Sequence, residues 1–407
     1  MKRGPSIHMG PPAWGPDFFD REEIIEECWK TLESASVILS APRRYGKSSV
    51  MLSLRDNPLD EFFPIYFELE EHSSLQGFIY ELVSKIVEND KSIMKTFKRW
   101  LSKVFQGIEE LSVLEVKIKI KKAIEKDGDW EAWKERIKQL MKDLLKNKKN
   151  KKLLFILDEF PMMLSNFINE GEKGEREAVK ALHWLRKLRH ESPLLENARF
   201  ILGGSIGIEK VVSYLKATRT INDVKKIVIG PFEHHVAEDF IRMLFKVNGI
   251  SVDDKVIKAI MDVVGTMIPI YLQIMVDSII KESMTTGSKI VPDLVKYCYE
   301  NRVHGPEYKQ YFEDYYDRLC RYYKTEEKLK SAEQMLKELA NADDGISYDN
   351  LFYIYQEKMG KKGDVEKFEL LLSALESDFY IERDEAEKKV YFHNKWLKDW
   401  WRIHHGV

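Results

Sequence analysis

The chain of 407 residues contains little cysteine, with Cys28, Cys298 and Cys320 as its three thiols. They form no C-x-x-C pair, and no histidine lies near them at the spacing of metal ligands. This shortage argues against a disulfide framework and against a zinc-ribbon type of site. We expect three reduced and mostly buried thiols.

The sequence also lacks long apolar runs and an excess of charge of either sign. No apolar segment approaches the roughly 18–20 residues that a membrane helix needs, and the first residues contain no apolar core typical of a secretory signal. We therefore expect a cytoplasmic protein with no membrane partner. Lys and Arg total 65 and Asp and Glu total 67, so binding to nucleic acid would require a local basic patch.

Apolar residues make up 44% of the chain, and short apolar runs alternate with helical patterns between residues 36 and 232. The runs typical of buried strands cover 36–40, 62–70, 152–160, 199–205 and 225–232. Helical patterns cover 20–34, 74–90, 129–152 and 175–190, and Asp20 is the expected cap of the first. This order predicts an α/β fold with a mainly parallel sheet covered by helices on both faces. The strict alternation over 112–121 predicts one further strand, half-buried at a sheet edge or in a hairpin.

The character of the chain changes after residue 232. Residues 234–300 have helical patterns only, with Pro269 expected to kink one helix, and an aromatic-rich connector covers 301–325. Helices over 326–341, 347–359 and 364–379 and strands over 379–383 and 389–393 follow, which is the order of a winged helix. The predicted domains are a core over 1–232, a helical lid over 233–300, and a connector with a winged-helix-like domain over 301–407.

The stretch SAPRRYGKSSV at 40–50 is nearly a phosphate-binding loop, G-x-x-x-x-G-K-[ST], with Ala41 in place of the first glycine. A strand, a tight turn and a helix start are the parts such a loop needs. Gly46 permits a positive φ, Lys47 can reach the β- and γ-phosphates, and Ser48 can bind magnesium. Ala41 weakens the site only if its position requires a positive φ.

A second motif follows the apolar strand LLFILDEF, where two carboxylates stand at the strand end. We expect Asp158 to hold Mg²⁺ and Glu159 to position and deprotonate the attacking water. The alternative that this second motif alone leaves open is a pair of acids that only cap a strand end. Ser205, at the end of RFILGGS, is a candidate contact to the γ-phosphate, or equally a polar residue that opens a loop.

In order and spacing, five segments resemble the archaeal-type P-loop ATPases of the AAA+/STAND group, which are related to origin-recognition initiators. The segments are FFDREEII (18–25), APRRYGKSS (41–49), LLFILDEFP (153–161), RFILGGS (199–205) and GTMIPIYLQ (265–273). The resemblance implies a RecA/AAA-like P-loop NTPase core with a lid and a winged helix, and ATP and Mg²⁺ as cofactors. It places Phe19 and Arg21 near the adenine, in a box where Asp20 replaces a glycine. The candidate nucleotide-binding residues are Phe19, Arg21, Pro42, Arg43, Arg44, Tyr45, Gly46, Lys47, Ser48 and Ser49, the catalytic candidates are Lys47, Glu159 and Ser205, and the metal ligands are Ser48 and Asp158.

The arginines leave alternatives open. Arg43 and Arg44 match the arginine pair of that group, and they point at phosphate, at a neighbouring subunit, or only at solvent. Arg199 and Arg219 are candidates for an arginine finger by position alone. If the arginine must come from a second copy or a partner protein, the isolated chain turns over slowly. GTP is disfavoured because no N-K-x-D follows the carboxylate strand.

The C-terminal domain has two possible partners. The third helix of a winged helix is the usual DNA-reading element, but here it carries Asp364, Glu366, Glu369, Glu376 and Asp378 against one lysine, Lys367. Such acidity repels a phosphate backbone and favours contact with protein. The final helix groups Trp396, Leu397 and Trp400, with Trp401 beside them, and we expect these rings to pack in a core rather than stack on single-stranded nucleic acid.

The function that the sequence favours is an ATP-binding, magnesium-dependent ATPase whose nucleotide state sets the arrangement of its domains or a partner. A non-enzymatic ATP/ADP switch and a DNA-associated ATPase are the alternatives.

Overall fold

The computed structural model describes residues 5–101, 113–126, 129–148, 151–204, 206–322, 326–359 and 364–405. It divides into two compact units. The sheet unit comprises Arg21–Arg43 and Lys47–Ile229, and the helical unit comprises Met1–Asp20, Arg44–Gly46 and Gly230–Val407. The three-domain division at residues 232 and 300 stays a prediction.

The sheet unit is built on five parallel strands in the order β2-β3-β4-β1-β5. All five were predicted, and their bounds are β1 (Val37–Ser40), β2 (Phe62–Glu68), β3 (Lys152–Asp158), β4 (Ala198–Gly204) and β5 (Lys225–Val228). Strand β4 lies between β1, which leads into the phosphate-loop motif, and β3, which ends at the carboxylates. Because parallel strands end at the same edge, the two motifs meet there.

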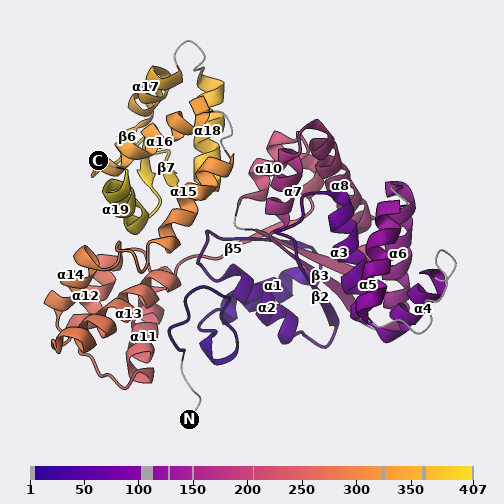
Figure 1. Ribbon diagram of the computed structural model, residues 1–407, viewed down its shortest axis with the longest axis horizontal. Coiled ribbons are helices and arrows are strands. Elements are labelled where there is room, and N and C mark those ends of the chain that lie inside the picture. The colour runs from indigo at the N-terminus through magenta and orange to yellow at the C-terminus, as the bar shows by residue number, and fades with distance from the viewer. Residues whose placement is uncertain are drawn as a thin grey trace. The chain divides into compact units, whose positions relative to one another are not determined.

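Helices cover both faces of this sheet. In Figure 1, α1 (Glu22–Leu32) and α2 (Lys47–Asp56) lie on one side and α7 (Phe160–Asn169) and α8 (Glu172–His190) on the other. The unit also holds α9 (Leu194–Asn197), α10 (Ile208–Tyr214) and the 3₁₀ turn η2 (Thr218–Ile221). The run Leu153–Leu157 in β3 is fully buried, as expected of a strand with both faces covered.

The expected cap of α1 is wrong. The N-cap residue is Arg21, without a side-chain cap hydrogen bond. Asp20 has a φ of +44°, which lies in the left-handed region that glycine adopts most easily.

Among the described residues between β2 and β3 lie four helices: α3 (Leu75–Glu88), α4 (Lys91–Leu101), α5 (Val113–Lys126) and α6 (Trp130–Asn147). Helix α5 shows that the strand predicted over 112–121 is wrong. Its described side chains bury Ile120, Ala123 and Ile124, spaced three and four apart as on one helix face, while Ile118 is 48% exposed. That buried face packs with α3.

In the helical unit, the short turn η1 (Gly15–Asp17) is followed, after residue 230, by α11 (His234–Val247), α12 (Asp254–Val264), α13 (Pro269–Thr286) and α14 (Pro292–Asn301). The helical character predicted over 234–300 is confirmed. Pro269 is the first residue of α13 rather than a kink inside it, because the first helical position needs no backbone N–H. The predicted connector contains a helix, α15 (Gln310–Tyr322).

The C-terminal elements have the predicted winged-helix order. They are α16 (Glu326–Asn341), β6 (Ile346–Ser347), α17 (Tyr348–Met359), α18 (Val365–Ser377), β7 (Ile381–Asp384), β8 (Lys389–Phe392) and α19 (Lys395–His404), with the antiparallel sheet order β6-β8-β7. The two-residue strand β6 was not predicted.

The tryptophans of α19 belong to the core, as predicted. Trp396, Trp400 and Trp401 are at most 2% exposed, and Trp396 stacks on Tyr271 of α13 with ring centroids 4.8 Å apart. Rings buried in this way have no free face for a nucleic-acid base. Across the described residues, no helix is long and apolar enough to cross a membrane.

Candidate functional site

The phosphate-loop motif joins the end of β1 to the start of α2. Gly46 has a φ of +90°, so glycine is required at this position. Ala41 is buried, and it is not among the described residues with positive φ. The replaced glycine is therefore not one that the backbone needs.

Lys47, the first residue of α2, is directed to the carboxyl edge of the sheet. Its side chain is 6% exposed, and its Nζ lies 3.1 Å from Oε1 of Glu159. Gly203 of β4 leaves room for the neighbouring Met51 of α2, because a Cβ at Gly203 would lie only 1.7 Å from Met51 Cε. The two motifs thus meet in a direct contact.

The two acidic residues at the end of β3, Asp158 and Glu159, have different environments. Asp158 ends the strand and is 3% exposed, and its Oδ1 accepts a hydrogen bond of 3.0 Å from the backbone N–H of Glu159. Glu159 has a left-handed φ of +55° before α7 begins. A non-glycine residue in this conformation costs about 1–2 kcal/mol, and such strain gathers at functional sites.

A residue that the sequence analysis missed completes this cluster. Tyr66 of β2 donates its hydroxyl to Oδ2 of Asp158 at 2.8 Å. Burial and the neighbouring Asp158 carboxylate raise the pKa of the Tyr66 phenol well above its usual range, so the group stays a neutral donor. The guanidinium of Arg55 in α2 lies 5.5 Å from the centroid of the same ring.

The donor set fits a magnesium ion. Ser48 offers a half-buried hydroxyl in the first turn of α2, and Asp158 offers a nearly buried carboxylate. Hard oxygen donors suit Mg²⁺, which commonly takes one or two protein ligands and completes its shell with water and phosphate. Among the described residues, no three His, Cys, Asp or Glu side chains are grouped so that they could hold a metal ion by themselves.

Other predicted site residues are divided between the two units. In the sheet unit, Pro42, Ser49 and Arg21 are buried, and Arg43 pairs with Glu70 at 3.6 Å. That pairing gives Arg43 a partner within its own unit.

The helical unit holds the remaining three. Phe19 packs on Phe232 and Phe240, with centroid distances of 6.0 and 5.2 Å. Arg44 lies over the ring of Tyr311 at 5.0 Å, and the Tyr45 hydroxyl is 3.3 Å from Nε2 of His393.

Three further candidates have different outcomes. Ser205 lies outside the described residues, so its role stays a prediction. Arg199 is 8% exposed at the start of β4, and its guanidinium donates to four backbone carbonyls, those of Leu32, Glu33, Leu195 and Ala198. These contacts give Arg199 a structural role, and the finger role that its sequence position suggested stays a prediction. Arg219 is exposed.

Some of the acidic residues expected on α18 are paired within the domain, while Asp364 and Glu366 are exposed. Glu369 and Glu376 pair with Arg383 of β7, at 3.3 and 2.5 Å, and Asp378 is 6% exposed. The side chains that α18 presents to solvent include Val365 and Leu370, which are 55% and 61% exposed. This surface is more apolar than the sequence suggested.

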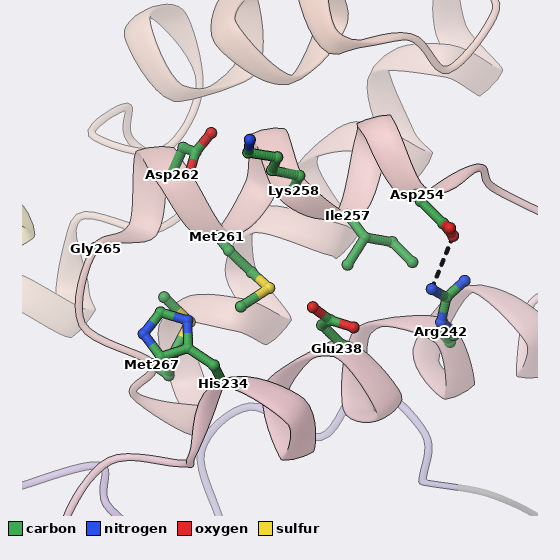
Figure 2. A pocket seen from close by; sticks show the side chains of 10 residues that line it. All are labelled: His234, Glu238, Arg242, Asp254, Ile257, Lys258, Met261, Asp262, Gly265 and Met267. Atoms are coloured by element: carbon green, nitrogen blue, oxygen red, sulfur yellow. Dashed lines mark hydrogen bonds and ion pairs between the residues drawn. The ribbon is translucent and has the colours of Figure 1, made fainter.

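A pocket of about 610 Å³ lies in the helical unit between α11 and α12 (Figure 2). Arg242 donates to Asp254 at 2.8 Å across one end, and the lining includes Met261 and Met267. It contains none of the predicted site residues, and its mixed charges indicate no particular ligand.

Comparison with known proteins defines the fold of the chain. A Walker-type ATPase of Pyrococcus abyssi aligns with 98% of this chain and 99% of its own length, at 17% identity and a TM-score of 0.60. The ORC2 protein of Aeropyrum pernix, solved in ADPNP–ADP complexes, aligns over 95% of this chain and 93% of its own, at 13% identity and a TM-score of 0.51. No protein-family model and no curated protein matches the chain. The resemblance to archaeal ATPases and origin-recognition proteins is thus confirmed as a shared fold over nearly the full length.

Proposed function

We propose that this chain binds ATP together with Mg²⁺ and hydrolyses it. The observation that carries the proposal is the meeting of Lys47 and Glu159 at 3.1 Å, beside the buried Asp158 at the carboxyl edge of a parallel sheet. A phosphate-binding lysine, a metal-binding carboxylate and a base for water are the three groups that this chemistry needs.

Each residue has a defined role in the proposal. The start of α2 and the Lys47 ammonium bind the phosphates, because helix N-termini and cations attract anions. Ser48 and Asp158 hold Mg²⁺, which when bound neutralises charge on the phosphates. Glu159 orients a water molecule and accepts its proton.

Two observations favour adenine over guanine as the base of the nucleotide. The sequence has no N-K-x-D after the carboxylate strand, which argues against guanine. The ORC2 protein of the same fold was solved in ADPNP–ADP complexes, which favours an adenine nucleotide here.

Slow turnover, or a switch that mostly holds its nucleotide, is the second candidate. Lys47 is already paired with Glu159. We expect the ammonium to leave the carboxylate when phosphate binds, so that the two arrangements form a two-state element. Arg199 is engaged with backbone carbonyls, so a finger from this position is less favoured. We expect an arginine from a second copy or a partner to accelerate hydrolysis, which would make the rate per chain rise with protein concentration.

A DNA-associated ATPase is less favoured. The exposed valine and leucine of α18 are better suited to a protein surface than to a phosphate backbone. We therefore expect no strong salt-dependent binding of duplex DNA.

Thermal unfolding tests the proposal. ATP with Mg²⁺ should raise the Tm of the wild type, and Lys47→Ala should abolish that rise. Lys148→Ala is the matched control, because Lys148 forms a similar pair of 3.0 Å with Asp90 in the sheet unit, and it should keep the shift. A wild type whose Tm does not respond to ATP and Mg²⁺ would refute nucleotide binding, and single-turnover behaviour in a multiple-turnover assay would favour the switch.

A further inference from the structure

Tyr66 contacts Asp158 beside Lys47 and Glu159, but it has no role in the proposed reaction. It lies on β2, opposite Ile156 of the parallel strand β3, while Glu68 lies opposite Asp158. Alternate residues of a strand share a face, so Tyr66 is diagonal to Asp158 on the same face. Aromatic side chains can bridge such a diagonal, and here the phenol oxygen reaches Oδ2 at 2.8 Å.

The two oxygens of Asp158 are therefore held from different sides. Oδ1 accepts from the Glu159 backbone N–H at 3.0 Å, and Oδ2 accepts from Tyr66. Two donors on the two oxygens fix the plane of a carboxylate, which a single bond does not. An ionised carboxylate has about four lone-pair positions, so both hydrogen bonds leave oxygen lone pairs for a metal ion.

The phenol ring also has a neighbour in α2. The Arg55 guanidinium lies over its ring, and Arg55 is held by Asp56 at 2.6 Å. The hydroxyl thus reaches Asp158 from a side chain that is supported by α2, the helix that also begins with Lys47.

We propose that Tyr66 is a positioning residue that orients the Asp158 carboxylate for Mg²⁺. This inference rests on the proposed function. Partners that orient a metal ligand typically change metal affinity or activity by about 10- to 100-fold when they are removed. A merely structural tyrosine would instead alter stability and leave metal binding unchanged.

The experiment measures the affinity for ADPNP by calorimetry, once in EDTA and once with saturating Mg²⁺. The ratio of the two affinities reports how strongly the metal supports nucleotide binding, without any turnover. In Tyr66→Phe this ratio should fall by roughly 10-fold or more, while the affinity in EDTA stays at the wild-type value. Tyr214→Phe is the matched control, because Tyr214 of α10, which is 61% exposed, donates to Glu175 at the same distance of 2.8 Å. Both affinities of this variant should match wild type.

The outcomes separate the two hypotheses. A wild type that fails to bind ADPNP under either condition refutes the proposed function. A Tyr66→Phe variant with the wild-type ratio refutes the positioning role alone. A wild type that binds ADPNP equally well with and without Mg²⁺ refutes the positioning role and also contradicts the Mg²⁺ part of the proposed function. Equal losses of affinity in EDTA and in Mg²⁺ also refute it, because they indicate a general structural effect.

A second comparison covers the case in which Tyr66→Phe does not fold. In Asp158→Asn the side chain is neutral and no longer depends on the hydrogen bond from the phenol. Tyr66→Phe can therefore be introduced into this variant. If Tyr66 acts through Asp158, the double variant has the same ADPNP affinity with Mg²⁺ as Asp158→Asn alone. A further loss in the double variant refutes the proposal.

Discussion

Replacing Glu159 by Gln should tighten nucleotide binding while it destabilises the nucleotide-free protein. Lys47 and Glu159 lie 3.1 Å apart with side chains 6% and 14% exposed. In the proposed function Lys47 must leave Glu159 to reach phosphate, so the free energy of this pair opposes binding. Removing the carboxylate removes that opposition, and it leaves a nearly buried ammonium without this partner.

The magnitude lies between two limits. Exposed ion pairs contribute about 0.2–1 kcal/mol, whereas breaking a buried pair from one side costs about 3–5 kcal/mol. For this partly buried pair we expect about 1–3 kcal/mol, which corresponds to a roughly 5- to 150-fold change in affinity. By the thermodynamic cycle, the stability lost without nucleotide and the affinity gained for it should be of similar size.

Two measurements check this relation. Urea unfolding without nucleotide gives the loss in free energy of unfolding, and calorimetry with ADP gives the gain in affinity. Glu68→Gln is the control for a change of net charge, because Glu68 is exposed and lies opposite Asp158 on β2. A Glu159→Gln variant that loses stability but binds ADP with wild-type affinity would show that the pair persists in the nucleotide-bound state, and the reasoning would be wrong.

Three further predictions concern the scaffold. Gly204→Ala should destabilise the protein by about 1–3 kcal/mol, because the new Cβ would lie 2.4 Å from Cδ of the rigid Pro161 ring; Gly230→Ala, where a Cβ would meet nothing within 4 Å, is the control in urea unfolding. Arg199→Ala should lower stability by about 2–4 kcal/mol, since it removes the guanidinium donor of four backbone carbonyls, yet ADP affinity should stay unchanged; a selective loss of ATP turnover in a stably folded variant would support the finger role. Burial lowers the pKa of His304 to about 4. The charge of Asp399 opposes this shift, and His404 reinforces it. The neutral imidazole is favoured in the native state, so stability should be full above pH 6.5 and fall by about 3 kcal/mol as the pH drops to 4; urea unfolding of His304→Phe should lack this part of the slope, and an equal slope would contradict the assignment.

The strands and the winged-helix order could be predicted because their signals are local. The run Leu153–Leu157 is apolar without interruption, and both faces of β3 are covered. The three tryptophans of α19 share one helix face, and that face is buried. In each case burial follows the period of the sequence pattern.

Helix α5 was misassigned because its pattern satisfies two periods. The alternation of apolar and charged residues from Leu114 to Ile120 fits a strand, but the buried set continues through Ala123 and Ile124 at helical spacing. Packing against α3 decides between strand and helix. This tertiary contact is not contained in a window of ten residues. Tyr66 was missed for a related reason, since its partner Asp158 is 92 residues away in sequence.

The phosphate-loop motif shows where residue identity and backbone geometry carry different information. The motif treats its two glycines alike, but here only Gly46 has the φ that requires one. Ala41 has no such requirement, whereas Arg44 and Glu159 adopt left-handed angles of +75° and +55° without being glycines. A strained conformation persists only when surrounding contacts over-determine it, and Glu159 has such a contact in Lys47. The departure from the motif at Ala41 therefore says little against a working site, and the strain at Glu159 is the stronger indication in its favour.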